Sequence, residues 1–126
     1  MSRRIVVIDD SSLIRAAARI GLEQVGGHEA LVAESGAEGI ELARTRRPDA
    51  ILLDVVMPDL DGPATLALLQ AGAETRDVPV VFMTGRDDAG ELALLRGLPG
   101  AVDVITKPFD VLSLSRLLDT ALGWAA

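Results

Sequence analysis

Short apolar runs alternate along this chain with longer segments in which apolar residues recur at helical spacing. The short runs predict five strands, at residues 4–9, 29–34, 50–54, 79–84 and 102–106, and a helix is expected after each of them. Strands and helices that alternate in this order are typical of a parallel sheet covered by helices. We therefore expect an α/β fold made of five consecutive βα units.

Three of the predicted strands are nearly all apolar. They contain the runs Ile5-Val6-Val7-Ile8, Ile51-Leu52-Leu53 and Val80-Val81-Phe82-Met83. A strand of a parallel sheet that has helices on both faces needs apolar residues at successive positions. These three strands are therefore expected at the centre of the sheet.

The helical segments carry apolar stripes and recognisable ends. The stripes, each predicted to form one buried face, are Leu13, Ala17 and Ile20 in the first helix and Leu114, Leu118 and Ala121 in the last. Gly26-Gly27 predicts the end of the first helix, and Pro48 follows the end of the second. Asp61 is a predicted cap ahead of Gly62-Pro63 in the third helix.

Length and composition predict one folded domain. A chain of 126 residues, of which 49% are apolar and 25% charged, can bury a core and is not expected to be disordered. The fifth helix is expected to end near Leu122. Residues 1–126 are therefore expected to form a single domain with no attached output domain.

Composition also narrows the location and the partners. No apolar run approaches the ~20 residues of a membrane span, and no secretory signal is recognisable at the N-terminus. The absence of cysteine excludes disulfides and thiolate metal sites and suits a reducing cytoplasm. A net charge of −7 disfavours direct nucleic-acid binding, because phosphate backbones attract clustered Lys and Arg. We therefore expect a cytoplasmic protein with protein partners.

Acidic, hydroxyl and lysine side chains stand where the predicted strands end. Asp9-Asp10 closes the first strand, Asp54 the third and Thr84 the fourth, and Lys107 follows the fifth. In open parallel sheets, ligands bind in the crevice beyond the carboxyl ends of the strands. If the strands take the flavodoxin-like order 2-1-3-4-5, these residues converge on one pocket.

Such a pocket favours a divalent cation. Three carboxylates in one place repel each other unless a cation lies among them. Magnesium fits because it takes oxygen ligands and commonly joins a carboxylate to a phosphoryl group. Lys107 and Thr84 would then be a charge partner and a hydroxyl donor for phosphoryl oxygens.

Each of these residues also has an ordinary explanation when taken alone. Asp9-Asp10 can be a helix cap, Thr84 a turn residue and Lys107 a solvated side chain. Asp54 is harder to explain in this way, because a charge at the edge of the core brings no structural gain. Only the combination is specific.

Four motifs, spread over essentially the whole chain, resemble those of the response-regulator receiver family. They are Asp9-Asp10; Asp54-Val55-Val56-Met57-Pro58-Asp59-Leu60-Asp61-Gly62; Thr84-Gly85; and Thr106-Lys107-Pro108-Phe109. The resemblance implies a single-domain response regulator of a two-component system, similar to the chemotaxis regulators. Such a protein is a signalling switch and not a turnover enzyme.

The resemblance also implies a role for the residues that meet the phosphoryl group. Asp54 would accept it from a phosphohistidine of a sensor histidine kinase or a histidine phosphotransfer protein. Lys107 would pair with the phosphoryl group, and Thr84 would turn its hydroxyl toward it. The Lys107-Pro108 bond would be cis.

Magnesium is the one cofactor that the resemblance implies. Asp10, Asp54 and the backbone carbonyl of Val56 would hold the ion, and Asp9 would act mainly through a bound water. The switch would catalyse its own phosphorylation and dephosphorylation and signal to an unknown downstream protein through its fourth helix, fifth strand and fifth helix. It would be a monomer or a phosphorylation-dependent homodimer. Chemotaxis, a relay shuttle and a phosphate sink all stay open as pathways.

The sequence departs from the family pattern at some positions. Val104 stands where many members carry an aromatic residue that rotates inward on activation, which puts that readout in question. Pro99 cannot donate a backbone hydrogen bond, and the fourth helix is expected to end early. Val56 and Arg86 stand where family members influence the path of the attacking water.

Three other functions compete with this one. A receiver-like scaffold that binds partners without phosphorylation is the main alternative, although such scaffolds tend to lose one of the acidic, Thr or Lys residues. A flavin mononucleotide carrier is disfavoured, because the first loop lacks a Ser, Thr and Gly run and the chain has one Trp and no Tyr. A magnesium-dependent phosphatase is disfavoured because such enzymes usually carry Asp-x-Asp on the first strand.

The remaining conspicuous residues are given structural interpretations. His28 is expected to be solvated in a loop, and Trp124 is expected to help dock the last helix. Leu92, Leu95 and Leu112 are candidates for an interaction face if exposed, and for the core if not.

Overall fold

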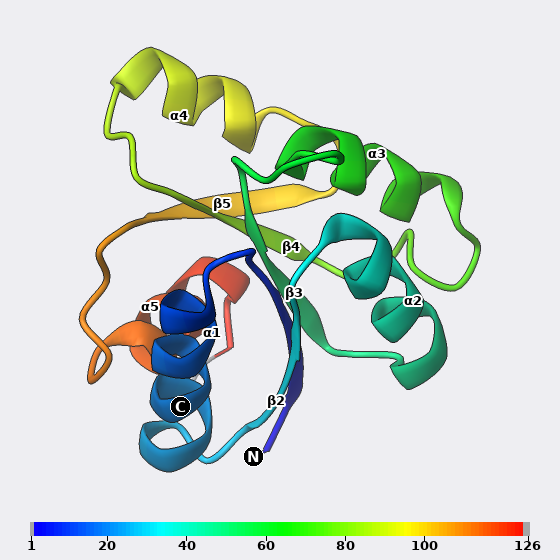
Figure 1. Ribbon diagram of the computed structural model, residues 1–126. Coiled ribbons are helices and arrows are strands. Elements are labelled where there is room, and N and C mark those ends of the chain that lie inside the picture. The colour runs from blue at the N-terminus through cyan, green and yellow to red at the C-terminus, as the bar shows by residue number, and fades with distance from the viewer. Residues whose placement is uncertain (1, 125–126) are drawn as a thin grey trace.

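A five-stranded parallel sheet with helices on both faces forms the protein (Figure 1), and the computed structural model describes residues 2–124. The elements are β1 (Arg4–Ile8), α1 (Ser12–Arg19), the π-helical η1 (Ile20–Val25), β2 (Glu29–Ala33), α2 (Gly36–Arg46), β3 (Ala50–Asp54), α3 (Gly62–Ala71), β4 (Val80–Thr84), α4 (Ala89–Arg96), β5 (Ala101–Thr106) and α5 (Leu114–Leu122). The strand order is β2-β1-β3-β4-β5. The predicted flavodoxin-like fold is confirmed, and β1, β3 and β4 are the inner strands, as expected.

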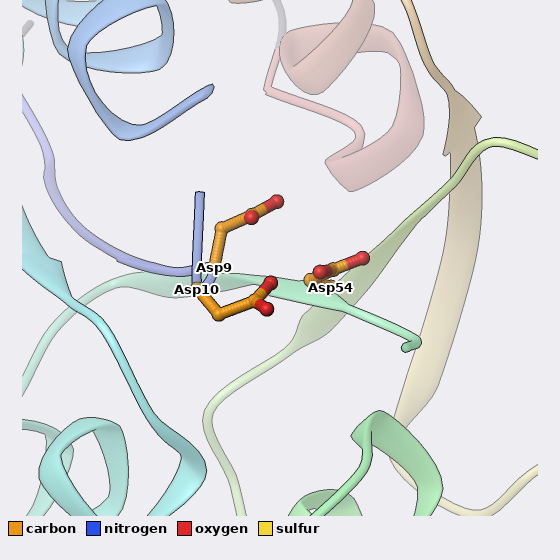
Figure 2. Close-up of side chains that lie close together, drawn as sticks. All are labelled: Asp9, Asp10 and Asp54. Carbon is orange, nitrogen blue, oxygen red and sulfur yellow. The ribbon is translucent and has the colours of Figure 1, made fainter. Parts of the chain in front are cut away.

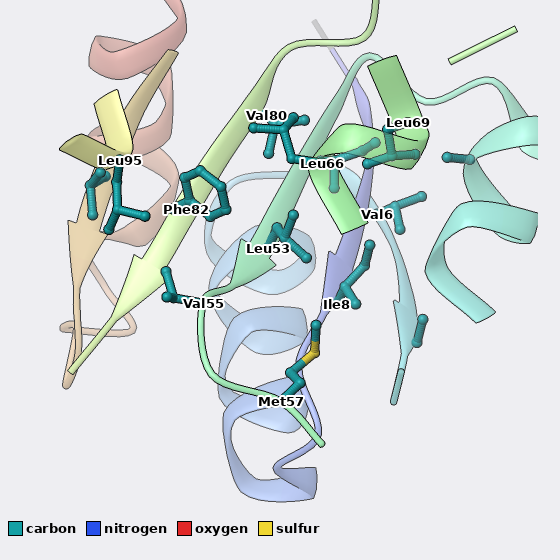
Figure 3. Packing of buried hydrophobic residues seen from close by; sticks show 14 residues of the cluster. Val6, Ile8, Leu53, Val55, Met57, Leu66, Leu69, Val80, Phe82 and Leu95 are labelled. Carbon is teal, nitrogen blue, oxygen red and sulfur yellow. The ribbon is translucent and has the colours of Figure 1, made fainter. Parts of the chain in front are cut away.

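Each face of the sheet carries its own buried cluster, because successive side chains of a strand point to opposite faces. Val6, Leu53 and Phe82 lie in the cluster under α2, α3 and α4, part of which Figure 3 shows. Val7 and Leu52 lie in the cluster under α1 and α5. The central strands therefore need apolar residues at every position, as their sequence indicates.

The predicted buried stripe of the first helix is wrong. Leu13 is 77% exposed and Ile20 is 45% exposed, whereas Ala18 and Leu22 are buried. Gly21 explains the choice of face: a Cβ placed there would lie 2.7 Å from the carbonyl oxygen of Val111 and 3.3 Å from Leu114 Cβ. The glycine thus allows the start of α5 to approach the helix on the face that contains Ala18 and Leu22. The predicted stripe of the last helix is right, because Leu114 and Leu118 are buried.

His28 is not solvated, which corrects the prediction for this residue. Its side chain is 8% exposed, and its Nδ1 accepts a hydrogen bond from the backbone N–H of Arg3 at 3.0 Å. Trp124 lies against the same imidazole with the ring centroids 6.2 Å apart, and the Arg3 guanidinium lies 4.7 Å from the Trp124 ring centroid. The chain turns just before His28, at Gly27, which has a positive φ of 72°. The sequence pattern did not show where this turn places the histidine. Trp124 packs against the cluster under α5, as expected.

Most predicted helix ends agree with the structure. The Asp61 carboxylate accepts from the backbone N–H of Ala64 and caps α3, and α4 ends at Arg96, before Pro99. Three leucines were candidates for either the core or an interaction face. Of these, Leu95 is buried in the core and Leu112 is 73% exposed. Leu92 is partly buried against the core. Within residues 2–124 no helix is long and apolar enough to cross a bilayer.

Candidate functional site

Three carboxylates meet at the carboxyl edge of the sheet (Figure 2). Asp9 and Asp10 follow β1, and Asp54 ends β3; β1 and β3 pair with Ile8 opposite Leu53, so the acids are brought side by side. One oxygen from each side chain lies within 4.8 Å of the others. Asp9 is fully buried and Asp54 is 3% exposed, whereas Asp10 is exposed. The cluster therefore opens to solvent on the Asp10 side.

Lys107 joins two of these acids. Its Nζ donates to Asp9 Oδ2 at 3.2 Å and to Asp54 Oδ1 at 3.0 Å. The backbone N–H of Lys107 donates to the carbonyl of Thr84 at 2.7 Å, and the Lys107-Pro108 bond is cis, as predicted. Three carboxylates and one ammonium leave the cluster two negative charges in excess. The site therefore favours a divalent cation.

Lys107 is the single lysine of the chain, whose other basic side chains, apart from one histidine, are all arginines. This count is a sequence signal that the motif alone does not use. A lysine ammonium is a compact point charge, whereas a guanidinium is a broad planar fork. The compact charge suits a position between two carboxylates that are nearly buried.

The pKa values of the paired groups reflect their surroundings. Burial raises the pKa of Asp54, although the hydrogen bond from Lys107 opposes this; the charge of Asp9 raises it further, and the backbone N–H of Val56 lowers it. Burial lowers the pKa of Lys107, but hydrogen bonds and charges from Asp54 and Asp9 outweigh burial and raise it overall. The shifts agree physically, since Lys107 has two acidic partners and Asp54 shares one ammonium with another acid. The lysine is thus held charged beside an acid that resists ionisation.

Asp9 makes its hydrogen bonds to protein groups. Its Oδ1 accepts from the backbone N–H of Ser11 at 2.9 Å, and Oδ2 accepts from Lys107. Its carbonyl oxygen accepts from Arg15 Nη1 at 2.9 Å. The sequence prediction missed Arg15. Its place in the sequence could have indicated this contact. Arg15 lies four residues after Ser11, and a long side chain in a helix points back over the preceding turn, here toward Asp9.

Thr84 is brought to the site but is not bonded to the acids. It is 2% exposed at the end of β4, and its Oγ1 accepts from the backbone N–H of Arg86 at 3.2 Å. Within residues 2–124 the hydroxyl has no hydrogen bond to a carboxylate of the cluster. The Arg86 side chain is 70% exposed and pairs with Glu91 at 3.4 Å.

The loop after β3 is held tightly against the core. Val55 and Met57 are 9% and 7% exposed and contribute to the cluster in Figure 3, whereas Val56 between them is 67% exposed. The backbone N–H of Gly62 donates to the carbonyl of Val55 at 2.8 Å. A Cβ on Gly62 would lie 2.6 Å from the carbonyl oxygen of Asp54. Only glycine allows this close return, which turns Val56 outward beside Asp54.

The fold and this site define a receiver domain, and comparisons with known proteins agree. The family model of the response regulator receiver domain matches residues 5–119. Protein PilH of Pseudomonas aeruginosa is 36% identical over 120 residues, which cover 95% of this chain and 98% of PilH. Response regulator MprA of Mycobacterium ulcerans is 38% identical over 110 residues; these cover 86% of this chain, which spans 45% of MprA. The chain belongs to the response regulator receiver family.

A solved structure supports the same assignment. The receiver domain of sensor histidine kinase PA1611 from Pseudomonas aeruginosa superimposes with a TM-score of 0.83 and 26% identity, over 98% of this chain and 99% of that one. That structure has a magnesium ion coordinated in its active-site cleft. In this chain the acidic cluster of Asp9, Asp10 and Asp54 lies at the carboxyl edge of the sheet.

Proposed function

We propose that this receiver accepts a phosphoryl group on Asp54 from a phosphohistidine of a sensor histidine kinase or a histidine phosphotransfer protein, in a magnesium-dependent reaction. The observation that carries the proposal is the buried Asp54 carboxylate, which lies 3.0 Å from Lys107 Nζ inside a cluster with two excess negative charges. A carboxylate in this setting is a nucleophile with a cation already beside it.

The donor set fits Mg²⁺. Carboxylate oxygens are hard ligands, and Mg²⁺ usually combines one or two of them with waters and phosphoryl oxygens. Asp10, Asp54 and the backbone carbonyl of Val56 would hold the ion. Asp9 would act through a bound water, because its two carboxylate oxygens already accept from Ser11 and Lys107. The ion would supply positive charge for the phosphoryl oxygens.

In the transfer, one carboxylate oxygen of Asp54 forms a bond to phosphorus while the bond between phosphorus and the donor histidine nitrogen breaks. The electron pair of the broken bond stays on the imidazole nitrogen. Phosphoryl transfer depends mainly on positioning and on neutralising charge. Lys107 would pair with a phosphoryl oxygen, and Thr84 would give up the N–H of Arg86 and donate its hydroxyl to another. Hydrolysis of the aspartyl phosphate at the same site would reset the switch.

The movement of Thr84 and Lys107 would be read on the face formed by α4, β5 and α5. The backbone N–H of Lys107 donates a hydrogen bond to the carbonyl of Thr84. A displacement of either residue would therefore also displace the end of β5. A groove of about 490 Å³ lies on this face and includes Val104, Phe109 and Leu117. Val104 is 8% exposed and fills the position of the family's aromatic residue. A downstream protein would bind here.

The test is the intact mass of the protein after incubation with phosphoramidate, whose phosphorus–nitrogen bond resembles that of phosphohistidine. The wild type is expected to gain one phosphoryl group with Mg²⁺ and none with a chelator. Asp54→Asn is expected to gain none. Asp87→Asn is a matched control, because it removes an exposed acid that follows β4 outside the cluster, and it should behave as the wild type.

The absence of any mass gain in folded wild-type protein with Mg²⁺ would refute the proposal. The same conclusion follows if Asp54→Asn gains the group as readily as the wild type. The first result would favour a scaffold that binds its partner without phosphorylation, and the second would place the phosphoryl group on a residue other than Asp54.

A further inference from the structure

Arg15 points from α1 back toward the acidic pair. Its Nη1 donates to the carbonyl oxygen of Asp9 at 2.9 Å, and its side chain is 18% exposed. In the part of the chain that the structure describes, its ion pair is with Glu34, at 3.9 Å from a side chain that is 69% exposed. An ion pair that is this long and this exposed contributes little. The hydrogen bond to Asp9 is therefore the main polar contact of this largely buried guanidinium.

The carbonyl that Arg15 holds belongs to the peptide group between Asp9 and Asp10. A peptide group is planar, so fixing the direction of its carbonyl also fixes the direction in which the next residue leaves. Among the described residues, the side-chain hydrogen bonds of the acidic pair are made by Asp9 and not by Asp10. The exposed Asp10 carboxylate is directed toward Asp54 (Figure 2), so the backbone that carries it has a large part in its placement.

We infer that Arg15 is a positioning residue for the metal site: it orients the peptide between Asp9 and Asp10 so that the Asp10 carboxylate stays beside Asp54. The inference rests on the proposed function, since it concerns the Mg²⁺ that phosphoryl transfer to Asp54 needs. Arg15 touches neither the metal nor the phosphoryl group. Its effect passes through the Asp9 carbonyl.

The charge of Arg15 and its hydrogen bond act on Mg²⁺ in opposite directions. Removal of a positive charge near three carboxylates strengthens cation binding by itself. Loss of a hydrogen bond that orients a metal ligand typically weakens metal binding by about 10- to 100-fold. The sign of the change therefore separates positioning from charge.

Calorimetric titration of metal-free protein with MgCl₂ provides the test. Arg15→Met is expected to raise the Kd for Mg²⁺ about 10-fold. Arg15→Lys, which retains a charged donor on a shorter side chain, should fall between it and the wild type. Arg19→Met is the matched control: it removes the same charge from the same helix, where Arg19 is 52% exposed and pairs with Glu23 at 3.3 Å. Its Kd should stay within about twofold of wild type.

Two further readings separate positioning from a general loss of structure. Thermal unfolding without Mg²⁺ reports the stability of each variant, and the Arg15→Met Kd should rise even where the protein is fully folded. With phosphoramidate as donor, Arg15→Met should need more Mg²⁺ for half its maximal phosphorylation rate. Its rate at saturating Mg²⁺ should return close to that of the wild type.

A Kd for Arg15→Met equal to or below the wild-type value would overturn the inference. An equal weakening in Arg19→Met would also overturn it, because Arg19 pairs with Glu23 and the effect would then not depend on the hydrogen bond to the Asp9 carbonyl. In both cases the proposed function stands if the wild type still gains its phosphoryl group on Asp54. If the wild type gains none at any Mg²⁺ concentration, the proposed function fails, and the role of Arg15 fails with it.

Discussion

Replacing Lys107 by methionine should destabilise the metal-free protein at neutral pH. The ammonium lies 3.2 Å from an Asp9 oxygen and 3.0 Å from an Asp54 oxygen, and methionine retains most of the aliphatic side chain but not the charge. Without the ammonium, two nearly buried carboxylates face each other and a third lies beside them. The variant therefore isolates the electrostatic contribution of Lys107.

The size of the effect follows from the geometry. One charge pair at about 4 Å is worth about 4 kcal/mol at an effective dielectric constant of about 20, before the cost of desolvation. Breaking a buried pair by removing one partner costs about 3–5 kcal/mol. Lys107 is 19% exposed at an edge open to solvent, which reduces the effect. We expect a loss of about 2–3 kcal/mol, at or just below the lower limit of that range.

The pH dependence gives the result a second check. The pKa of Lys107 is raised above its ordinary 10.5, so its stabilising charge is present in full below pH 10.5 and is lost only as the pH rises through the raised value. Toward acid, the difference between variant and wild type should shrink as Asp54 takes up a proton. For Asp54 this uptake begins above the ordinary carboxyl pKa of 3.8, because its own pKa is raised.

Urea unfolding in the presence of a chelator provides the assay, with the fluorescence of Trp124, the one tryptophan of the chain, as the signal. With a slope of about 2 kcal/mol per molar urea, the midpoint should fall by about 1–1.5 M. Arg86→Met is the control, because Arg86 is 70% exposed, and a change within about 0.5 kcal/mol is expected. A Lys107→Met midpoint equal to or above the wild-type value at neutral pH would refute the reasoning.

Three further predictions concern other residues. Asp54→Asn should unfold at a higher temperature than the wild type at neutral pH in chelator, because burial raises the Asp54 pKa and ionisation then costs stability. This advantage should vanish as the pH falls toward 3.8. A melting temperature below that of the wild type at neutral pH would contradict the prediction. Arg47→Gly should raise the unfolding free energy in urea by about 0.5–1 kcal/mol, because Arg47 ends α2 with a positive φ of 46° that favours glycine; no gain would argue against backbone strain there. Gly62→Ala should lower the unfolding free energy by about 1–3 kcal/mol and weaken Mg²⁺ binding in calorimetry. The reason is that its Cβ would lie 2.6 Å from the Asp54 carbonyl oxygen and 2.8 Å from Val55 Cα. An unchanged Mg²⁺ affinity would show that the loop adjusts without moving the site.

The alternation of strands and helices was predictable from the sequence because it depends on local periodicity. The wholly apolar runs at residues 5–8, 51–53 and 80–83 require a sheet that is covered on both faces, and the structure has it. The cap at Asp61 and the early end of α4 depend on side chains within a few residues, and both agree with the structure. Asp54 could be singled out because a charge directly after a buried run is costly unless it has a use.

The meeting of the site residues depends on contacts between distant parts of the chain, which the spacing of residues within one segment does not predict. Lys107 and Asp9 are 98 residues apart in the chain, and they meet because parallel pairing places the ends of β1, β3, β4 and β5 at one edge. The family motifs pointed to this edge. They did not reveal that Lys107 bridges Asp9 and Asp54, or that Arg15 holds the carbonyl between the two acids of the pair.

The tertiary structure alone decided which face of the first helix is buried and where His28 lies. The helix has two apolar stripes, one through Leu13 and Ile20 and another through Ala18 and Leu22, and helical periodicity permits either. The close approach of α5 at Gly21 selects the second. Periodicity is a property of one segment, whereas burial is a property of what packs against it, and a neighbour from the far end of the chain supplies that contact.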